Sequence, residues 1–214
     1  MANRFEGQSV TELGDPSCPK GDAGEEMLRR MNDSHYPVTG WALDILDVRP
    51  ESRVLDIGCG GGRTLMRMAE KAAEGKLTGV DYSDVSVALS REMNSEAVSS
   101  GRMEIVKASV SSLPFDDNSF DRIITVESFY FWSDPQNDLK EVFRVLDKGG
   151  RFLITADIHG GAELSTEEKA SVEKYHLFNP TPGQFRELLT NAGFIDVQIH
   201  TKENTHWICA EGRK

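Results

Sequence analysis

Between residues 53 and 156, short runs of apolar residues alternate with segments of helical composition. The apolar runs predict buried strands at 53–57, 77–80, 103–106, 120–126 and 151–156. Helices are predicted between them, at 61–74, 83–95 and 134–146. Strands that alternate with helices roughly every 20 to 30 residues form a parallel sheet with helices on both faces. The chain is therefore predicted to be an α/β protein.

The two ends of the chain follow other patterns. Residues 1–20 are polar and interrupted by Gly and Pro, which predicts a loose arm. Two short helices are expected next, at 22–33 and from Pro37 onward. The second is expected to pack through a face formed by Trp41, Ala42, Ile45 and Leu46.

The C-terminal third begins with two capping-box patterns, at Ser165 and Thr181, which predict two further helices. Two final strands are expected at 194–200 and 206–210. The polar turn between them is too short for a helix, so these strands must form an antiparallel hairpin.

Composition limits the partners and the compartment. The chain has 35 Asp and Glu against 24 Lys and Arg, a net charge of -11. Nucleic-acid binding depends on Lys and Arg contacts with phosphates, so no nucleic-acid partner is predicted. A membrane span, a signal peptide and a disulfide or metal cluster are not expected either. We expect one globular domain in the cytoplasm, as a monomer or homodimer, with no membrane partner and no metal.

A glycine-rich turn, within Val54-Leu55-Asp56-Ile57-Gly58-Cys59-Gly60-Gly61-Gly62-Arg63-Thr64, joins the first strand to a helix. Glycine permits positive φ and lets a ligand approach the backbone, and the helix N-terminus offers free N–H groups. A dinucleotide fingerprint would require a third glycine where Arg63 stands, which disfavours a nicotinamide dehydrogenase. A tight turn between a strand and a helix can also use these glycines for structural reasons alone.

Two acids follow the ends of strands near this turn. Asp56, just before the turn, suits a ligand that carries a positive charge. Asp81 ends the second strand, 19 residues after Gly62, where a carboxylate can accept the hydroxyls of a ribose. Asp81 has a structural alternative as a helix cap, although Ser83 can fill that position.

Further segments follow in order: LTGVDYS, LPFDDNSFDRIITVESFYFW, LKEVFRVLDKGGRFLIT, FRELLTNAGFIDVQI and HWICAEGRK. Together with the glycine turn, over about residues 50–212, they resemble the class I S-adenosylmethionine-dependent methyltransferases of the small-molecule, UbiE-like type. The resemblance implies a Rossmann-like, doubly wound sheet of seven strands. Its order would be 3-2-1-4-5-7-6, with strand 7 antiparallel.

The resemblance implies S-adenosylmethionine as methyl donor and S-adenosylhomocysteine as product. The residues that it places around the methionine part are Asp56, Gly58, Cys59, Gly60 and Glu127. Asp81 would hold the ribose, and Tyr82, Ser109 and Val110 would meet the adenine. The family often has an acid at the position of Ser109, and a serine there would bind the adenine amino group more weakly.

The acceptor side is expected at loops above the carboxyl ends of the strands. Methyl transfer depends mainly on positioning, and a base is needed only if the nucleophile must lose a proton. His35 and its neighbour Tyr36, in a loop between two helices, are the first catalytic candidates, and Glu127 is the next. Other candidates, which packing alone would also explain, are Trp41, Phe129, Tyr130, Trp132, His159, Tyr175 and His176.

The chain is thus predicted to be a methyltransferase for a small-molecule acceptor. The alternatives are a protein or RNA methyltransferase and a non-enzymatic cofactor-binding module. Residues 21–46 carry more apolar surface than a tail needs, so we expect a lid over the cofactor. The expected division is an arm and helical lid at 1–48 and a methyltransferase domain at 49–214.

Overall fold

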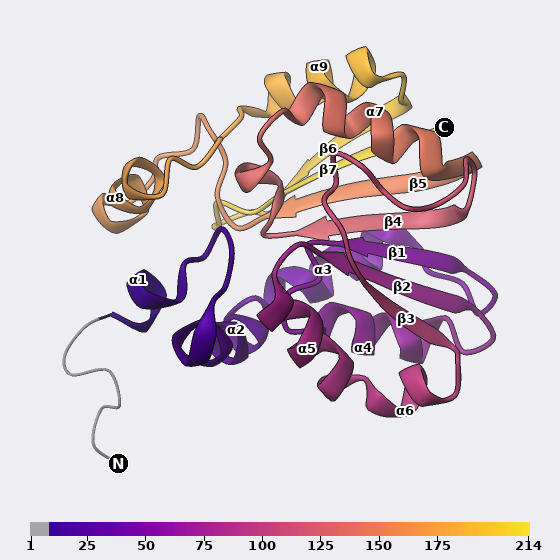
Figure 1. Cartoon of the computed structure of the whole chain (residues 1–214). Helices are drawn as coiled ribbons and strands as arrows, with labels where there is room; N and C mark the ends of the chain where they lie inside the picture. Colours follow the sequence, from indigo (N-terminus) through magenta and orange to yellow (C-terminus); the bar gives the residue numbers. More distant parts are fainter. Residues whose placement is uncertain (1–8) are drawn as a thin grey trace.

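The computed structural model describes residues 9–214. Seven strands form one sheet in the order β3-β2-β1-β4-β5-β7-β6 (Figure 1). The strands are β1 Arg53–Ile57, β2 Lys76–Asp81, β3 Met103–Lys107, β4 Phe120–Val126, β5 Leu146–Ala156, β6 Ile195–Thr201 and β7 Ile208–Arg213. Strands β1 to β5 pair in parallel, and β7 pairs antiparallel with β5 and β6. The expected order and the antiparallel seventh strand are confirmed.

Helices cover both faces of this sheet. They are α1 Val10–Gly14, α2 Gly21–Ser34, α3 Tyr36–Leu46, α4 Arg63–Lys71, α5 Asp84–Met93, α6 Ser95–Ser99, α7 Pro135–Val145, α8 Thr166–Lys174 and α9 Pro182–Ala192, with a 3-10 turn η1 at Phe129–Phe131. One core contains side chains of α7 and α9, and the other contains side chains of α3 and α4. Burial on both sides explains why the parallel strands are continuous apolar runs.

The predicted helix caps are present. Ser83 accepts a hydrogen bond from Ser86 N at the start of α5, and Asp134 accepts one from Asn137 N at the start of α7. Ser165 and Thr181 form complete capping boxes at α8 and α9. The local hydrogen-bonding chemistry of short polar side chains therefore fixes where these helices begin.

The N-terminal segment differs from the prediction in two ways. The part of the arm that is described contains α1, and residues 1–8 lie outside the described residues. Helix α3 buries Val38, Thr39, Ala42, Leu43 and Leu46, whereas Trp41 and Ile45 are only half-buried. Since three of these buried side chains belong to the α3–α4 core, α3 is part of the scaffold. The expected lid is therefore narrowed to α1, α2 and the segment between them, and we call this part of residues 9–214 the cover.

The start of β5 also differs from the prediction. The sequence predicts a strand at 151–156, but β5 begins at Leu146, which pairs with Phe120. The register then shifts between Phe120 and Arg122, and Gly149 has a positive φ of 75°. The glycines therefore form an irregularity within a long strand.

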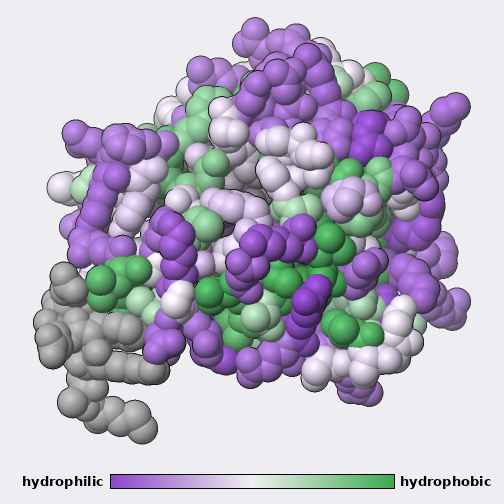
Figure 2. All heavy atoms as spheres, viewed as in Figure 1, coloured by the Kyte–Doolittle hydropathy of each residue, from purple (hydrophilic) through white to green (hydrophobic). Residues whose placement is uncertain are grey.

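The cartoon places α1, α2 and α8 beyond the carboxyl ends of the parallel strands (Figure 1). Hydrophilic residues cover most of the face shown in Figure 2, and hydrophobic residues gather in patches across its middle. Within residues 9–214, no helix is long and apolar enough to cross a membrane.

Candidate functional site

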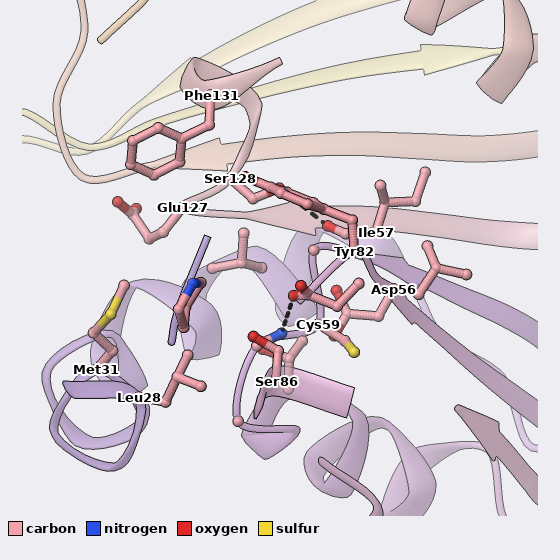
Figure 3. Close-up of a pocket in the computed structure, with 18 of the residues that line it drawn as sticks. Leu28, Met31, Asp56, Ile57, Cys59, Tyr82, Ser86, Glu127, Ser128 and Phe131 are labelled. Carbon is pink, nitrogen blue, oxygen red and sulfur yellow. Dashed lines mark hydrogen bonds between the residues drawn. The ribbon is translucent and has the colours of Figure 1, made fainter. Parts of the chain in front are cut away.

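A cavity of about 390 Å³ lies at the carboxyl ends of β1, β2 and β4. It is lined by the glycine turn, by the residues after these strands, and by the segment from Pro16 to Thr39. Leu28 and Met31 of α2 lie across from Phe131 of η1, and Glu127 projects into the space between them (Figure 3). The volume of this cavity is at the low end of the range for sites that bind small molecules.

The glycine turn needs glycine for both conformation and space. Gly58, Gly60 and Gly62 have φ values of 73°, 50° and 82°, which side chains disfavour. The N–H groups of Gly58 and Cys59 donate to the carbonyl oxygen of Val80, at 2.8 and 3.0 Å. A Cβ on Gly58 would lie 2.3 Å from Ser128 Oγ. The turn is therefore tied to β2 and packed against the residues that follow β4.

Asp81 holds the turn from the other side. Its side chain is 8% exposed and accepts hydrogen bonds from Gly60 N at 3.0 Å and Ser83 N at 2.9 Å. Burial raises the pKa of Asp81, and hydrogen bonds from the backbone of Ser83, Gly60 and Tyr82 and from the Ser86 side chain oppose this shift. Ser83 caps α5, so the alternative role of Asp81 as the helix cap is wrong.

Asp56 is 1% exposed at the end of β1, and its Oδ2 has no hydrogen-bond partner among the described residues. Burial, together with the nearby charge of Asp81, raises the pKa of Asp56 to about 8. A buried carboxylate without a partner is costly, so a cationic ligand in the cavity would stabilise its ionised form.

The cavity lining includes the residues expected near adenine. Tyr82, Ser109 and Val110 line it, and Tyr82 is 47% exposed. Pro16 and Ser17 of the N-terminal segment line the same cavity. Cys59 is buried, and its Sγ donates a long hydrogen bond of 3.8 Å to Ser90 Oγ.

His35, Glu127 and Asp157 meet beside the cavity, which His35 and Glu127 line and Asp157 does not, with one ligand atom of each within 4.8 Å of the others. Tyr130 donates a hydrogen bond to Glu127 Oε2 at 2.7 Å. Burial and the charge of Asp157 raise the pKa of Glu127 well above its usual value. Burial lowers the pKa of His35, and the Asp157 carboxylate partly offsets this effect. At neutral pH the imidazole is therefore neutral and can accept a proton.

Other candidates for the acceptor side lie elsewhere. Tyr36 is 48% exposed, is absent from the cavity lining, and packs against Arg67, whose guanidinium lies 4.0 Å from its ring centroid. Trp41 lies beside Trp207, with ring centroids 6.2 Å apart. His159, Tyr175 and His176 do not line the cavity. Phe129 is buried in the core, whereas Trp132 both packs against it and lines the cavity.

Two residues at this site were missed by sequence reasoning. Asp157 directly follows β5, and an acid at the carboxyl end of a parallel strand is the signal that would have identified it. Arg63 lines the cavity and pairs with Asp33 at 3.2 Å, and its buried Nε has no hydrogen-bond partner within residues 9–214. The sequence analysis used Arg63 only as the position where a dinucleotide-binding fingerprint would require a third glycine.

The sequence and the fold were compared with known proteins. The family model described as "Methyltransferase domain" matches residues 55–154. Cycloartenol-C-24-methyltransferase 1 of Oryza sativa subsp. japonica is 36% identical over 51% of this chain and 31% of its own length. Sarcosine/dimethylglycine N-methyltransferase of Halorhodospira halochloris is 29% identical over 90% of this chain and 64% of its own length. The chain thus spans less than two thirds of both relatives.

A solved structure shares the fold. Phosphoethanolamine N-methyltransferase 2 of Haemonchus contortus, in complex with S-adenosyl-L-methionine, superposes with a TM-score of 0.78 at 17% identity. The match covers 97% of this chain and 60% of the other. With the matched domain, the seven-stranded sheet in its order and the glycine turn at the cavity, the chain belongs to the class I S-adenosylmethionine-dependent methyltransferases.

Proposed function

We propose that this protein transfers a methyl group from S-adenosylmethionine to a small molecule, at the cavity described above. The observation that carries the proposal is Asp81, whose buried carboxylate lines the cavity and holds the glycine turn through Gly60 N. When bound, the cofactor supplies a methyl group on a positively charged sulfur.

The residues present fit this cofactor. Asp81 would accept the ribose hydroxyls, and Tyr82, Ser109 and Val110 would surround the adenine. The unpartnered Oδ2 of Asp56 would orient the ammonium of the methionine part, alongside the backbone of Gly58, Cys59 and Gly60. No ion pair within residues 9–214 neutralises Asp56 or Asp81 with a Lys or Arg, so the lining favours a ligand with positive charge.

The acceptor would occupy the end of the cavity near His35, Glu127 and Trp132. His35 is the proposed base, since its neutral imidazole can accept a proton from the acceptor. Phe131 and Trp132 would exclude water from this end. The small cavity and the net charge of -11 support a compact acceptor rather than a nucleic acid.

The experiment that tests the proposal is calorimetric titration with S-adenosylhomocysteine. Asp81→Ala should weaken binding by about 1.5–3 kcal/mol, because two hydrogen bonds to a charged acceptor are lost. Asp84→Asn, a change at an exposed acid that pairs with Lys107, serves as the control. Equal affinities of Asp81→Ala and the unmodified protein would disprove the ribose assignment, and no binding by the unmodified protein would disprove the function.

A further inference from the structure

Three side chains from distant parts of the chain converge beside the expected position of the methyl acceptor. His35 lies between α2 and α3, Glu127 follows β4, and Asp157 follows β5. One nitrogen or oxygen of each lies within 4.8 Å of the others. The convergence follows from the fold, because β4 and β5 are parallel neighbours that end at the same edge.

Glu127 shows that this cluster is incomplete. Its side chain is 5% exposed, and Tyr130 satisfies only Oε2. Oε1 is buried and makes no hydrogen bond of normal geometry among the described residues, although Asp157 lies close enough to interact with the Glu127 carboxyl group. The carboxylate projects into the open part of the cavity between Phe131 and Met31 (Figure 3). A buried carboxylate oxygen without a partner is expensive, which indicates a missing donor or cation.

The backbone at Glu127 supports the same conclusion. Its φ is 54°, in the left-handed region that costs energy for a residue with a side chain. Its N–H donates to the carbonyl oxygen of Thr155 at 3.0 Å, which fixes this conformation against β5. The fold therefore accepts backbone strain at the residue that aims the carboxylate into the cavity.

Charge identifies the kind of ligand. Neither Glu127 nor Asp157 takes part in an ion pair within residues 9–214. We propose that His35, Glu127 and Asp157 bind the ammonium group of a small organic amine, which is the methyl acceptor; this rests on the proposed function.

The lining favours an ammonium over a metal ion, whereas the separation of the ligand atoms, up to 4.8 Å, is compatible with either. The adjoining lining is Phe131, Trp132 and Met31, which suits the carbon skeleton of an amine and the attraction of cations to aromatic rings.

The same residues can accept the proton that the ammonium group must lose before methyl transfer. An ammonium has no lone pair, so it must first give one proton to the neutral imidazole of His35 or to a carboxylate of the cluster. The amine nitrogen then forms a bond to the methyl carbon as the bond between that carbon and sulfur breaks. The bonding electrons remain on sulfur, which leaves S-adenosylhomocysteine and a methylated ammonium. The bound ammonium favours the ionised form of Glu127, which burial alone disfavours, and Glu127 and Asp157 then stabilise the positive charge before and after transfer.

The test is calorimetric titration of the full chain, saturated with S-adenosylhomocysteine, at neutral pH. The probes are isobutylamine, benzylamine and 2-phenylethylamine, each compared with its alcohol. We expect at least one amine to bind tenfold or more tightly than its alcohol. Asp157→Asn should remove this preference and keep the affinity for S-adenosylhomocysteine, and Glu127→Gln should also remove it. Glu51→Gln, a change at an exposed acid outside the cavity, should keep both.

Other results would overturn the inference in distinguishable ways. If every amine bound no better than its alcohol while S-adenosylhomocysteine bound normally, the acceptor class would be wrong and the proposed function would stand. The cluster would be a metal site if one Mn²⁺ ion bound per chain, if Glu127→Gln abolished Mn²⁺ binding, and if bound Mn²⁺ prevented the amines from binding. Failure of the unmodified protein to bind S-adenosylhomocysteine would remove the proposed function itself.

Discussion

Ser83 donates its hydroxyl hydrogen to the carbonyl oxygen of Pro19, with 2.6 Å between the two oxygens. The same hydroxyl accepts a hydrogen bond from Ser86 N and so caps α5. One buried side chain therefore ties the segment between α1 and α2 to the helix that follows Asp81. Because Pro19 and Ser17 line the cavity, this contact sets the position of the cover over the expected adenine end.

Ser83→Ala should lower the free energy of unfolding by about 1–2 kcal/mol, since it removes a helix cap and a buried hydrogen bond. It should also weaken S-adenosylhomocysteine binding several-fold, because the cover loses its anchor. Chemical denaturation and calorimetry measure the two effects. Ser165→Ala removes the cap of α8, which does not line the cavity, so it should reduce stability and leave binding unchanged.

Amide exchange should separate the cover from the scaffold. S-adenosylhomocysteine should slow exchange in α1 and α2, whose residues Leu28 and Met31 line the cavity. The amides of Leu43 and Leu46 in α3 should already exchange slowly without ligand, because these side chains are 2% and 0% exposed in the core. Equal protection of α2 with and without ligand would contradict a closing cover.

Asp56→Asn should stabilise the ligand-free protein, and more so as pH rises. The pKa of Asp56 is raised from 3.8 to about 8 in the folded state, so the folded protein holds a proton that the unfolded chain releases. The resulting loss of stability grows between about pH 4 and pH 8, up to about 6 kcal/mol, and Asn removes it. Denaturation at pH 5.5 and 8.5 measures the difference.

A control and a contrary outcome accompany this prediction. Asp116→Asn, at an exposed position, should leave the pH dependence as it is. Equal stabilisation by Asp56→Asn at both pH values would show that Asp56 is ionised in the folded protein throughout this range. In either case Asp56→Asn should weaken S-adenosylhomocysteine binding, because Asn carries no charge to hold an ammonium.

The titration of His35 can be followed by NMR without any acceptor. Burial lowers its pKa from 6.5, and the neighbouring Asp157 opposes this shift. The titratable groups beside His35 are Glu127 and Asp157. Tyr130 donates a hydrogen bond to Glu127. The midpoint should lie below 6.5, and Asp157→Asn should lower it further. A midpoint above 6.5 would mean that the carboxylates outweigh burial and that His35 is charged near neutrality.

Much of the sheet could be predicted from the sequence, because buried parallel strands are continuous apolar runs bounded by turn residues. The predicted limits of β1 and β4 coincide with those observed. Helix α1 could not be predicted, since it has no side-chain cap and depends on packing: a Cβ on Gly14 would lie 2.9 Å from Ala23 O. Tertiary contacts, absent from a local pattern, decide such a segment.

Some residues of the candidate site could likewise be located from the sequence, and others could not. Asp56, Gly58 and Asp81 could be located because each has a fixed relation to the end of a strand, and the structure places all three at the cavity. Tyr36 was misplaced because neighbours on a helix point in different directions, so His35 faces the cavity while Tyr36 faces Arg67. The meeting of His35 with Asp157 depends on three distant segments, which no local pattern contains.

The sheet order has a consequence for synthesis on the ribosome. Strand β7 lies between β5 and β6, so β6 cannot join the sheet until residues 208–213 have been translated. Until then the edge of β5, with the fully buried Phe152 and Leu153, remains open. An exposed apolar edge pairs readily with other chains. Stalled or truncated chains that lack β7 should therefore aggregate, and chaperones should engage this protein late in translation.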